Sequence, residues 1–177
     1  KRGILFYNSH EFIKVNKPRY FIFENVKGLL SDSGGETFAK WVQYLGGKSV
    51  NGLPTLFPHE EAVDYHIYWR VLNAKNYGIP QNRERVFIIG IRDDEDNTFS
   101  FPKEELLTKR LRDVFESEVD EKYYLSKKMI EGFSGIDLNG ISRTIRCGGG
   151  SSTDDKHNFD LIKVGYINQN TQASQVF

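Results

Sequence analysis

Residues 19–30 read RYFIFENVKGLL, and this stretch decides the fold. After Arg19 come four aromatic or β-branched residues, a run that is typical of a strand buried on both faces, as in a parallel α/β sheet. Glu24 and Asn25 are expected to end the strand. A carboxylate directly after a buried strand lies at the carboxyl edge of the sheet, where open α/β folds bind ligands. The alternative is that Glu24 only caps the next helix or pairs with a surface lysine.

Two helices are predicted around this strand. The apolar spacing of residues 4–16 indicates a helix with Leu5, Ser9, Phe12 and Ile13 near one face. A second helix is predicted over residues 35–45, ended by two glycines.

Further strands follow these helices. Residues 48–64 are rich in turn formers and predict a loop, whereas residues 65–72 and 85–91 predict two strong strands. This order of elements indicates an α/β domain with a mixed sheet edge.

The periodicity weakens after Arg92. Short helices are predicted over 106–118 and 123–133, and short strands over 141–145 and 161–167, around three glycines at 148–150. Residues 92–122 carry 11 acidic and 6 basic side chains, which indicates an acidic connector between two parts of the chain. An ordinary charged surface is the alternative.

A second informative stretch, NYGIPQNRERVFIIGIR, occupies residues 76–92. Arg83 and Arg85 are two residues apart at the start of a strand, so their side chains are expected on the same face. Paired guanidinium groups suit a phosphate, or a carbonyl and a carboxylate together. The alternative is an ordinary surface network of Arg and Glu side chains.

The two stretches together resemble two blocks of the DNA cytosine-5 methyltransferase family, in the same order and about as far apart. The family's Glu-Asn-Val block matches at residues 24–26, and its Gln-x-Arg-x-Arg block matches at Gln81, Arg83 and Arg85. The resemblance covers residues 2–92 well. Beyond these, residues 123–126 and 144–146 look like pieces of the target recognition region of phage-like and restriction-modification members.

This resemblance implies an α/β fold, with part of a Rossmann-like methyltransferase sheet that uses S-adenosylmethionine (AdoMet), followed by part of a small irregular target recognition domain. Residues 1–102 would be the C-terminal part of the catalytic domain, and residues 103–177 would be part of the recognition domain. The parent enzyme would transfer a methyl group from AdoMet to C5 of a flipped cytosine in a specific duplex sequence. A restriction-modification or phage-type enzyme of the prokaryotic cytoplasm is expected.

The resemblance also implies roles for single residues. Glu24 would contact cytosine N3 and the exocyclic amine, Arg85 would reach O2, and Arg83 would hold the neighbouring phosphate or the catalytic loop. Asn25 and Gln81 would orient the site as substrate-binding residues. The protonation state of Glu24 stays open, because a glutamate flanked by two arginines is normally ionised, whereas donation to N3 needs a proton.

The recognition segment is expected to read the base pairs that flank the target. Glycines 148–150 would let the backbone approach DNA closely. A flexible surface loop is the alternative. The expected DNA contacts are Arg143, Arg146, Ser151, Ser152, Lys156 and Asn158.

Two departures from the family pattern limit the prediction. The family's nucleophile is a cysteine after a proline, in a loop that would precede Lys1, whereas Cys147 follows Arg146 and precedes three glycines. The glycine-rich cofactor turn is also absent, so most of the AdoMet site is expected outside this chain. We therefore expect the chain to begin and end mid-protein and to be inactive alone. The missing part would come from the N-terminal region of the same protein or from a second subunit.

The sequence argues against two kinds of partner, a membrane and a metal ion. No apolar run approaches the roughly 20 residues of a membrane span, and the four histidines show no metal-ligand spacing. Double-stranded DNA is the expected partner, without membrane or metal. A catalytically incomplete DNA-binding subunit of a split enzyme and an RNA cytosine methyltransferase stay open as alternatives. The long segment after Arg92, which looks like a recognition domain, favours DNA.

Overall fold

The computed structural model describes residues 4–116, 120, 139–142, 161–162 and 175–176. The chain divides into two compact units. The first unit is Lys1–Leu72 with Glu84–Lys103, and the second is Asn73–Arg83 with Glu104–Phe177. The second unit thus includes Asn73–Arg83, which the sequence analysis placed in the catalytic part. The functional division at residues 102 and 103 stays a prediction.

A mixed five-stranded sheet forms the centre of the fold, which confirms the predicted α/β class. β1 (Tyr20–Val26) pairs antiparallel with β5 (Glu84–Arg92). β2 (Ser49–Val50) pairs parallel with β4 (Tyr65–Asn73) and antiparallel with β3 (Leu53–Pro54). The hydrogen bonds Asp93 N–H to Asp64 O and Ala74 N–H to Arg83 O show that β4 and β5 run antiparallel. The order of the strands in the sheet is β1, β5, β4, β2 and β3.

The prediction of a first strand buried on both faces is wrong. Exposure alternates along β1: Tyr20 and Ile22 are 52% and 67% exposed, whereas Phe21 and Phe23 are half-buried and pack against the core. Within the described residues the helices cover only one face of β1, so only every second side chain is covered. The strand also continues through Glu24 to Val26 and does not end at Glu24.

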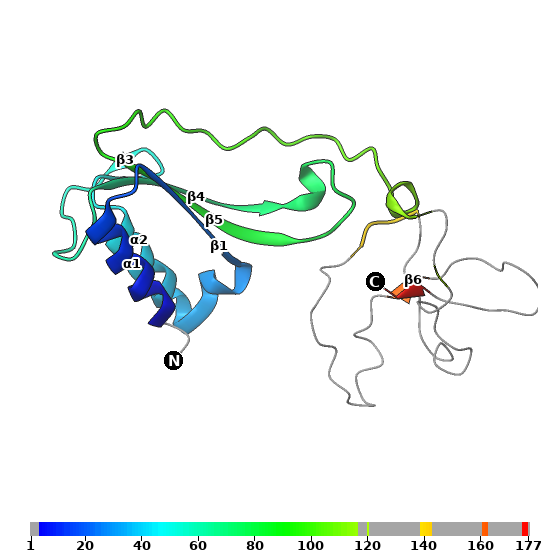
Figure 1. The fold of residues 1–177 in the computed structure, drawn as a ribbon, viewed down its shortest axis with the longest axis horizontal. Helices are drawn as coiled ribbons and strands as arrows, with labels where there is room; N and C mark the ends of the chain where they lie inside the picture. Colours follow the sequence, from blue (N-terminus) through cyan, green and yellow to red (C-terminus); the bar gives the residue numbers. More distant parts are fainter. Residues whose placement is uncertain (1–3, 117–119, 121–138, 143–160, 163–174, 177) are drawn as a thin grey trace, which may run out of the picture. The chain divides into compact units, whose positions relative to one another are not determined.

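Helices α1 (Ile4–Asn16) and α2 (Glu36–Leu45) confirm both predicted helices and cover the same face of the sheet (Figure 1). Of the residues predicted near one face of α1, Ile13 is buried, whereas Leu5 and Phe12 are 74% and 61% exposed. Phe6 and His10 face the core together with Ile13. The imidazole of His10 can be buried because its Nε2 lies 2.9 Å from the Glu61 carbonyl oxygen, which accepts its hydrogen bond.

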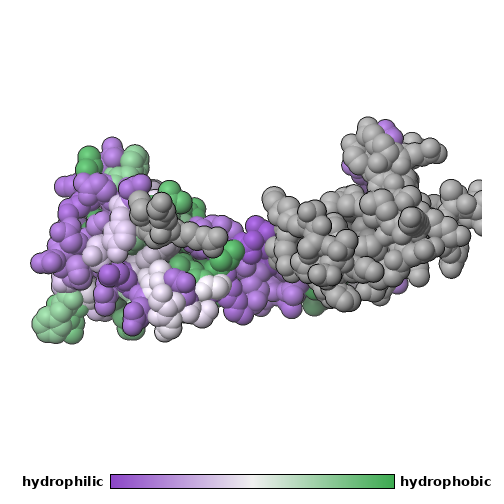
Figure 2. Space-filling model, turned by 90° about the horizontal axis from the view of Figure 1, so that it is seen from below, coloured by the Kyte–Doolittle hydropathy of each residue, from purple (hydrophilic) through white to green (hydrophobic). Residues whose placement is uncertain are grey.

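The core lies between the helices and the sheet. Phe6 and Trp41 stack with centroids 4.4 Å apart and connect α1 to α2. Seen from the helix side, the surface is mostly hydrophilic, with apolar side chains in separate groups (Figure 2). The buried members of the core are Phe6, Ile13, Leu29, Phe38, Leu45, Val63, Tyr65, Ile67, Val86 and Ile88.

The opposite face of β4 is covered by the segment that follows β5 (Figure 1). Phe99 lies against Tyr68, with ring centroids 5.4 Å apart, and the Arg70 guanidinium lies 4.9 Å from the centroid of Phe101. The segment therefore belongs to the sheet's packing, although it has no regular secondary structure of its own.

Part of the predicted loop at 48–64 is a hairpin. β2 and β3 are joined by Asn51 and Gly52, with φ of +49° and +82°. Two positive φ values define the turn that matches the twist of paired strands, and Asn-Gly favours it.

The segment after Lys103 differs from its prediction where it is described. In place of a helix over 106–118, a short 3-10 helix, η3, spans Leu111–Val114, and Leu106 is 88% exposed. A short helix without an apolar face to bury is marginal, which accounts for the difference. β6 (Leu161–Ile162) pairs antiparallel with β7 (Gln175–Val176). The predicted helix at 123–133 and residues 143–145 lie outside the described residues.

Candidate functional site

The candidate site in the first unit lies where β1 ends and β5 begins. In the antiparallel register, Val26 lies opposite Arg85 and Glu24 lies opposite Phe87. Residues that lie opposite one another, and residues two apart along a strand, point to the same face. Phe23 and Val86 belong to the core, so Glu24 and Arg85 share the face turned away from α1 and α2.

Glu24 and Arg85 form an ion pair. Arg85 Nε donates to Glu24 Oε1 over 2.8 Å, and Arg85 Nη1 donates to the Glu84 carbonyl oxygen, also over 2.8 Å. The Arg85 side chain is 16% exposed and the Glu24 side chain is 46% exposed. A largely buried guanidinium therefore orients a carboxylate that solvent, or a ligand, can reach.

Lys27 and Glu84 flank this pair. Lys27 Nζ lies 3.0 Å from Glu84 Oε1 and 3.1 Å from Oε2. The lysine thus pairs with Glu84 across the strands, while Glu24 contacts Arg85. The alternatives raised by the sequence, a lysine partner for Glu24 and an ordinary network of Arg and Glu side chains, stay open beside the proposed role in the site.

Asn25 points to the opposite face from Glu24. It lies opposite Val86 in the register, and its Oδ1 accepts the Val26 backbone N–H over 2.8 Å. The structure gives it this local contact at the end of β1. Its role as a substrate-binding residue stays a prediction.

Gln81 and Arg83 belong to the second unit. They lie in the segment from Pro80 to Arg83 that leads into β5. The Gln81 N–H donates to Ile79 O over 2.7 Å, and the Asn82 N–H donates to Ser142 O over 2.7 Å. The Arg83 N–H donates to Asn73 Oδ1 over 3.1 Å. All three backbone donors therefore bind protein acceptors.

Three residues that hold this segment, Asn73, Asn82 and Ser142, were not predicted from the sequence. Asn73 and Asn82 join through their side-chain amides, with Nδ2 of Asn73 2.7 Å from Oδ1 of Asn82. Ser142 forms a parallel bridge with Gln81. The expected DNA contacts, by contrast, lie outside the described residues: Arg143, Arg146, Ser151, Ser152, Lys156 and Asn158.

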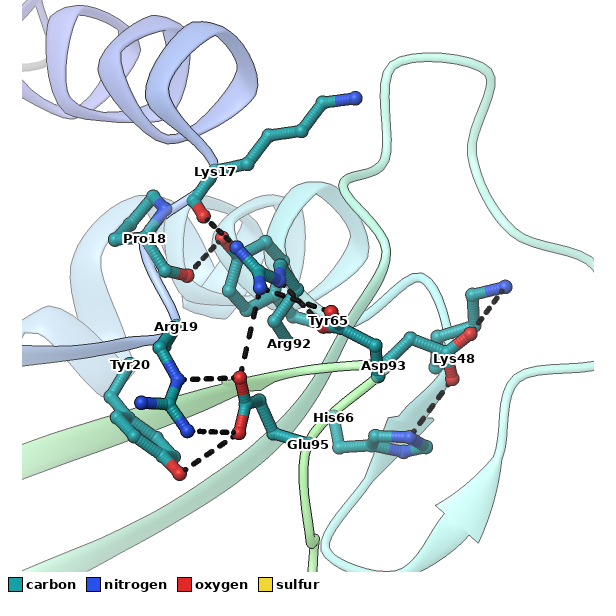
Figure 3. Close-up of polar contacts among 11 residues, drawn as sticks. Lys17, Pro18, Arg19, Tyr20, Lys48, Tyr65, His66, Arg92, Asp93 and Glu95 are labelled. Atoms are coloured by element: carbon teal, nitrogen blue, oxygen red, sulfur yellow. Dashed lines mark hydrogen bonds and ion pairs between the residues drawn. The ribbon is translucent and has the colours of Figure 1, made fainter.

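Ion pairs gather at the other end of β1 and β5 (Figure 3). Arg19 binds Glu95 through Nε and Nη2, over 2.6 Å and 2.8 Å. This hydrogen bonding, with the positive charge of Arg19, lowers the pKa of Glu95. Arg92 lowers the pKa of Asp94 in the same way. The acidic residues after β5 are therefore bound to the end of the sheet.

A Ser–His–Asp contact occurs in the same cluster. Ser49 Oγ lies 2.8 Å from His66 Nδ1, and His66 Nε2 lies 3.1 Å from Asp93 Oδ1. The hydrogen bonds that Lys48 Nζ donates to the carboxylates of Asp93 and Asp64 raise the pKa of Lys48. Ser49 is only 6% exposed, so its hydroxyl is withheld from substrates, and the contact stabilises the packing of β2 against β4.

The described residues show no group of three or more His, Cys, Asp or Glu side chains that could hold a metal ion. None of the described helices has the length and apolar character to cross a membrane.

A groove of about 410 Å³ lies between α1 and β1, lined mainly by apolar side chains such as Leu5, Phe12, Tyr20 and Phe23. None of its lining residues is charged. AdoMet carries a carboxylate, an ammonium and a sulfonium, which need polar partners. The groove does not fit that cofactor, and no described residue is assigned to it.

Comparison with known proteins relates the two motifs to a family. The sequence profile of C-5 cytosine-specific DNA methylases matches residues 1–175. Type II methyltransferase M2.ScrFI of Lactococcus lactis subsp. cremoris is 36% identical over 129 residues, which cover 73% of this chain and 31% of that protein. Orphan methyltransferase M.SPRI of Bacillus phage SPR is 34% identical over 155 residues, covering 71% and 32%.

Among solved structures, the Dnmt2 methyltransferase of S. pombe is similar over 71% of this chain and 37% of its own, with 20% identity and a TM-score of 0.44. The chain spans about a third of the length of the relatives named here. The profile match nevertheless extends over nearly all of its 177 residues, including both motifs. The chain belongs to the C-5 cytosine-specific DNA methylase family.

Proposed function

We propose that the complete protein containing these residues methylates C5 of cytosine in duplex DNA, and that Glu24 and Arg85 grip the target base. The observation that carries the proposal is the ion pair on one sheet face, with the Arg85 side chain 16% and the Glu24 side chain 46% exposed. A reacting base needs an acid or acceptor at one edge and a cation at another, held in fixed positions.

The chemistry explains why this pair is useful. C5 of cytosine is a weak nucleophile until a thiolate adds at C6, which moves electron density onto N3 and O2. Glu24 would hydrogen-bond N3 and the exocyclic amine, and Arg85 would stabilise charge at O2. AdoMet supplies the methyl group, and its site is proposed outside the described residues. A cysteine beyond these 177 residues, or on a second subunit, would provide the thiolate.

The other site residues receive supporting roles. Arg83 would hold the neighbouring phosphate or the catalytic loop, while Gln81 and Asn25 would orient the site. The target base must leave the helix to reach such a site, at a cost of a few kcal/mol of unstacking. The recognition segment, which includes Arg143 and Arg146, would read the flanking base pairs.

A specific duplex sequence is the proposed target. The sequence relatives support this, since one is named a type II methyltransferase and the other an orphan methyltransferase of a phage. A protein of this class would act on DNA in the prokaryotic cytoplasm.

The test is transfer of labelled methyl from AdoMet by the complete protein. Duplex DNA, single-stranded DNA and transfer RNA are compared, and the product is digested to identify 5-methylcytosine. The account expects duplex DNA to be methylated at one sequence and the isolated 177-residue chain to be inactive. Methylation of RNA but not of duplex DNA would overturn the substrate, and activity of the isolated chain would overturn the proposed need for an external cysteine.

A split enzyme is tested by the same assay. If the polypeptide that carries this chain is inactive alone but gains activity when a second subunit with a Pro-Cys motif is added, the activity belongs to the assembly. Activity of a single polypeptide contradicts that alternative.

A further inference from the structure

The segment from Pro80 to Arg83 is held on two sides by partners within the second unit. On one side, Ser142 N–H donates to Pro80 O over 2.8 Å, and the Asn82 N–H donates to Ser142 O over 2.7 Å. These two bonds bracket Gln81, which bridges Ser142. Ser142 directly precedes Arg143, so the chain runs from this bridge into the predicted recognition residues.

Asn73 holds the other side with a single side chain. Its Oδ1 accepts the backbone N–H groups of Arg83, over 3.1 Å, and of Lys75, over 3.3 Å. Its Nδ2 donates to Oδ1 of Asn82 over 2.7 Å. One amide therefore spans the ends of the loop that joins β4 to β5, using its acceptor and its donor together.

The contact between Asn73 and Asn82 also determines the side to which Gln81 and Arg83 point. In an extended segment, neighbouring side chains point to opposite sides. Asn82 is directed at Asn73, so Gln81 and Arg83 project to the other side. These two residues match the family motif, whereas Asn73 lies outside both quoted motifs.

We propose that Asn73 is a positioning residue that fixes the backbone of Arg83, and with it the direction in which the Gln81 and Arg83 side chains are presented to DNA. The inference rests on the proposed function of Arg83. It assigns Asn73 no contact with the substrate. A small displacement of a reacting or binding group is enough to lower the rate, since a shift of about 1 Å can cost about 100-fold.

Substitutions of Asn73 separate positioning from general stability. Asn73→Asp keeps an acceptor for the Arg83 N–H, and the Asn82 amide can rotate to donate to it. Asn73→Leu has a similar volume but neither donor nor acceptor. In the complete protein we expect kcat to fall at least about 10-fold for Asn73→Leu and less than about threefold for Asn73→Asp. Asn76→Leu is the matched control, because the Asn76 side-chain amide donates to Glu104 Oε1 over 2.9 Å, and this variant is expected to leave kcat unchanged.

Amide hydrogen exchange reports the contact itself. The Arg83 N–H should exchange faster in Asn73→Leu than in the wild type, and at the wild-type rate in Asn73→Asp. Equal exchange in all three proteins overturns the inference, whatever the activities are.

Combination with Arg83→Ala tests whether Asn73 acts through Arg83. Positioning predicts that Asn73→Leu lowers kcat in the wild-type background but not further in the Arg83→Ala background. An equal loss in both backgrounds means a general structural effect and overturns the inference. If Arg83→Ala itself changes neither kcat nor DNA affinity, the proposed role of Arg83 is the part that fails.

Discussion

Arg85 Nε and Glu24 Oε1 lie 2.8 Å apart, across the ends of two antiparallel strands separated by about 60 residues in the sequence. The contact joins the two motifs by which the chain resembles its family. The arginine is the more buried partner, and its Nη1 is also bound, to the Glu84 carbonyl oxygen. Nε thus holds the Glu24 carboxylate, and Nη1 holds the arginine side chain in place. The third nitrogen, Nη2, carries two further N–H donors.

Because each guanidinium nitrogen of Arg85 has its own task, we expect that lysine cannot replace this arginine. A single ammonium cannot reach Glu24, the Glu84 carbonyl and a base oxygen in fixed directions. We expect Arg85→Lys to lower kcat at least about 100-fold, comparable to the loss of one oxyanion donor. Steady-state methylation by the complete protein is the measurement. Arg70→Lys is the control, since Arg70 lies over Phe101, and an equal loss in both variants would contradict the role of Arg85.

Core packing predicts that two leucines differ strongly in their contribution to stability. Leu45 is 0% exposed at the end of α2, whereas Leu56 is 79% exposed. Leu45→Ala should lower the free energy of unfolding by about 2–5 kcal/mol, and Leu56→Ala by less than about 0.5 kcal/mol. Denaturant unfolding of the complete protein measures both. Similar losses would show that the helix–sheet interface is not the core.

A substitution at Gly52 is expected to lower stability through the backbone conformation alone, without a steric clash. Its φ is +82°, and an added Cβ would meet no atom within 4 Å. Gly52→Ala should therefore cost about 1–2 kcal/mol through the left-handed conformation alone. Gly28→Ala is the control, because Gly28 also has open space around it but no positive φ. Thermal unfolding compares the two, and an equal effect would contradict the assigned turn.

The Arg19–Glu95 pair predicts a loss of stability in acid. Arg19 lowers the pKa of Glu95 in the folded protein below its ordinary value of 4.5. The contribution is therefore complete above about pH 4.5 and is lost as the pH falls through the lowered pKa of the folded state. Glu95→Gln should reduce Tm at pH 6, and its difference from the wild type should shrink as the pH falls below about 4.5.

Glu11→Gln serves as the control for this prediction, because Glu11 lies on the exposed side of α1. Its Tm should follow the wild type from pH 6 to pH 3. If Glu95→Gln runs parallel to the wild type over the same range, the ion pair makes no pH-dependent contribution.

The bounds of the helices were predicted better than the side chains that the helices bury. The two helices were found at or within one residue of their bounds, because apolar spacing and glycines mark them. On the buried face of α1, Ile13 was found but His10 was missed, because the burial of His10 depends on the carbonyl of Glu61, 51 residues away. No local pattern contains such a partner.

The candidate site shows the same limit. Motif matching selected Glu24 and Arg85, and the structure brings them together. Asn73 was not selected, because its importance comes from contacts with Asn82 and the Arg83 backbone across a loop. Gly90 was also passed over. An added Cβ there would lie 2.1 Å from the ring of Phe21 on the paired strand, and only the register reveals this approach.

The central claim is that the Glu24 carboxylate acts on the reacting base and not on DNA binding. The most direct measurement compares Glu24→Gln with the wild type in the complete protein, recording single-turnover methylation and duplex affinity on the same DNA. The account predicts that the methylation rate falls at least about 100-fold, while Kd changes by less than about threefold. A methylation rate that falls no more than the affinity does would contradict the claim.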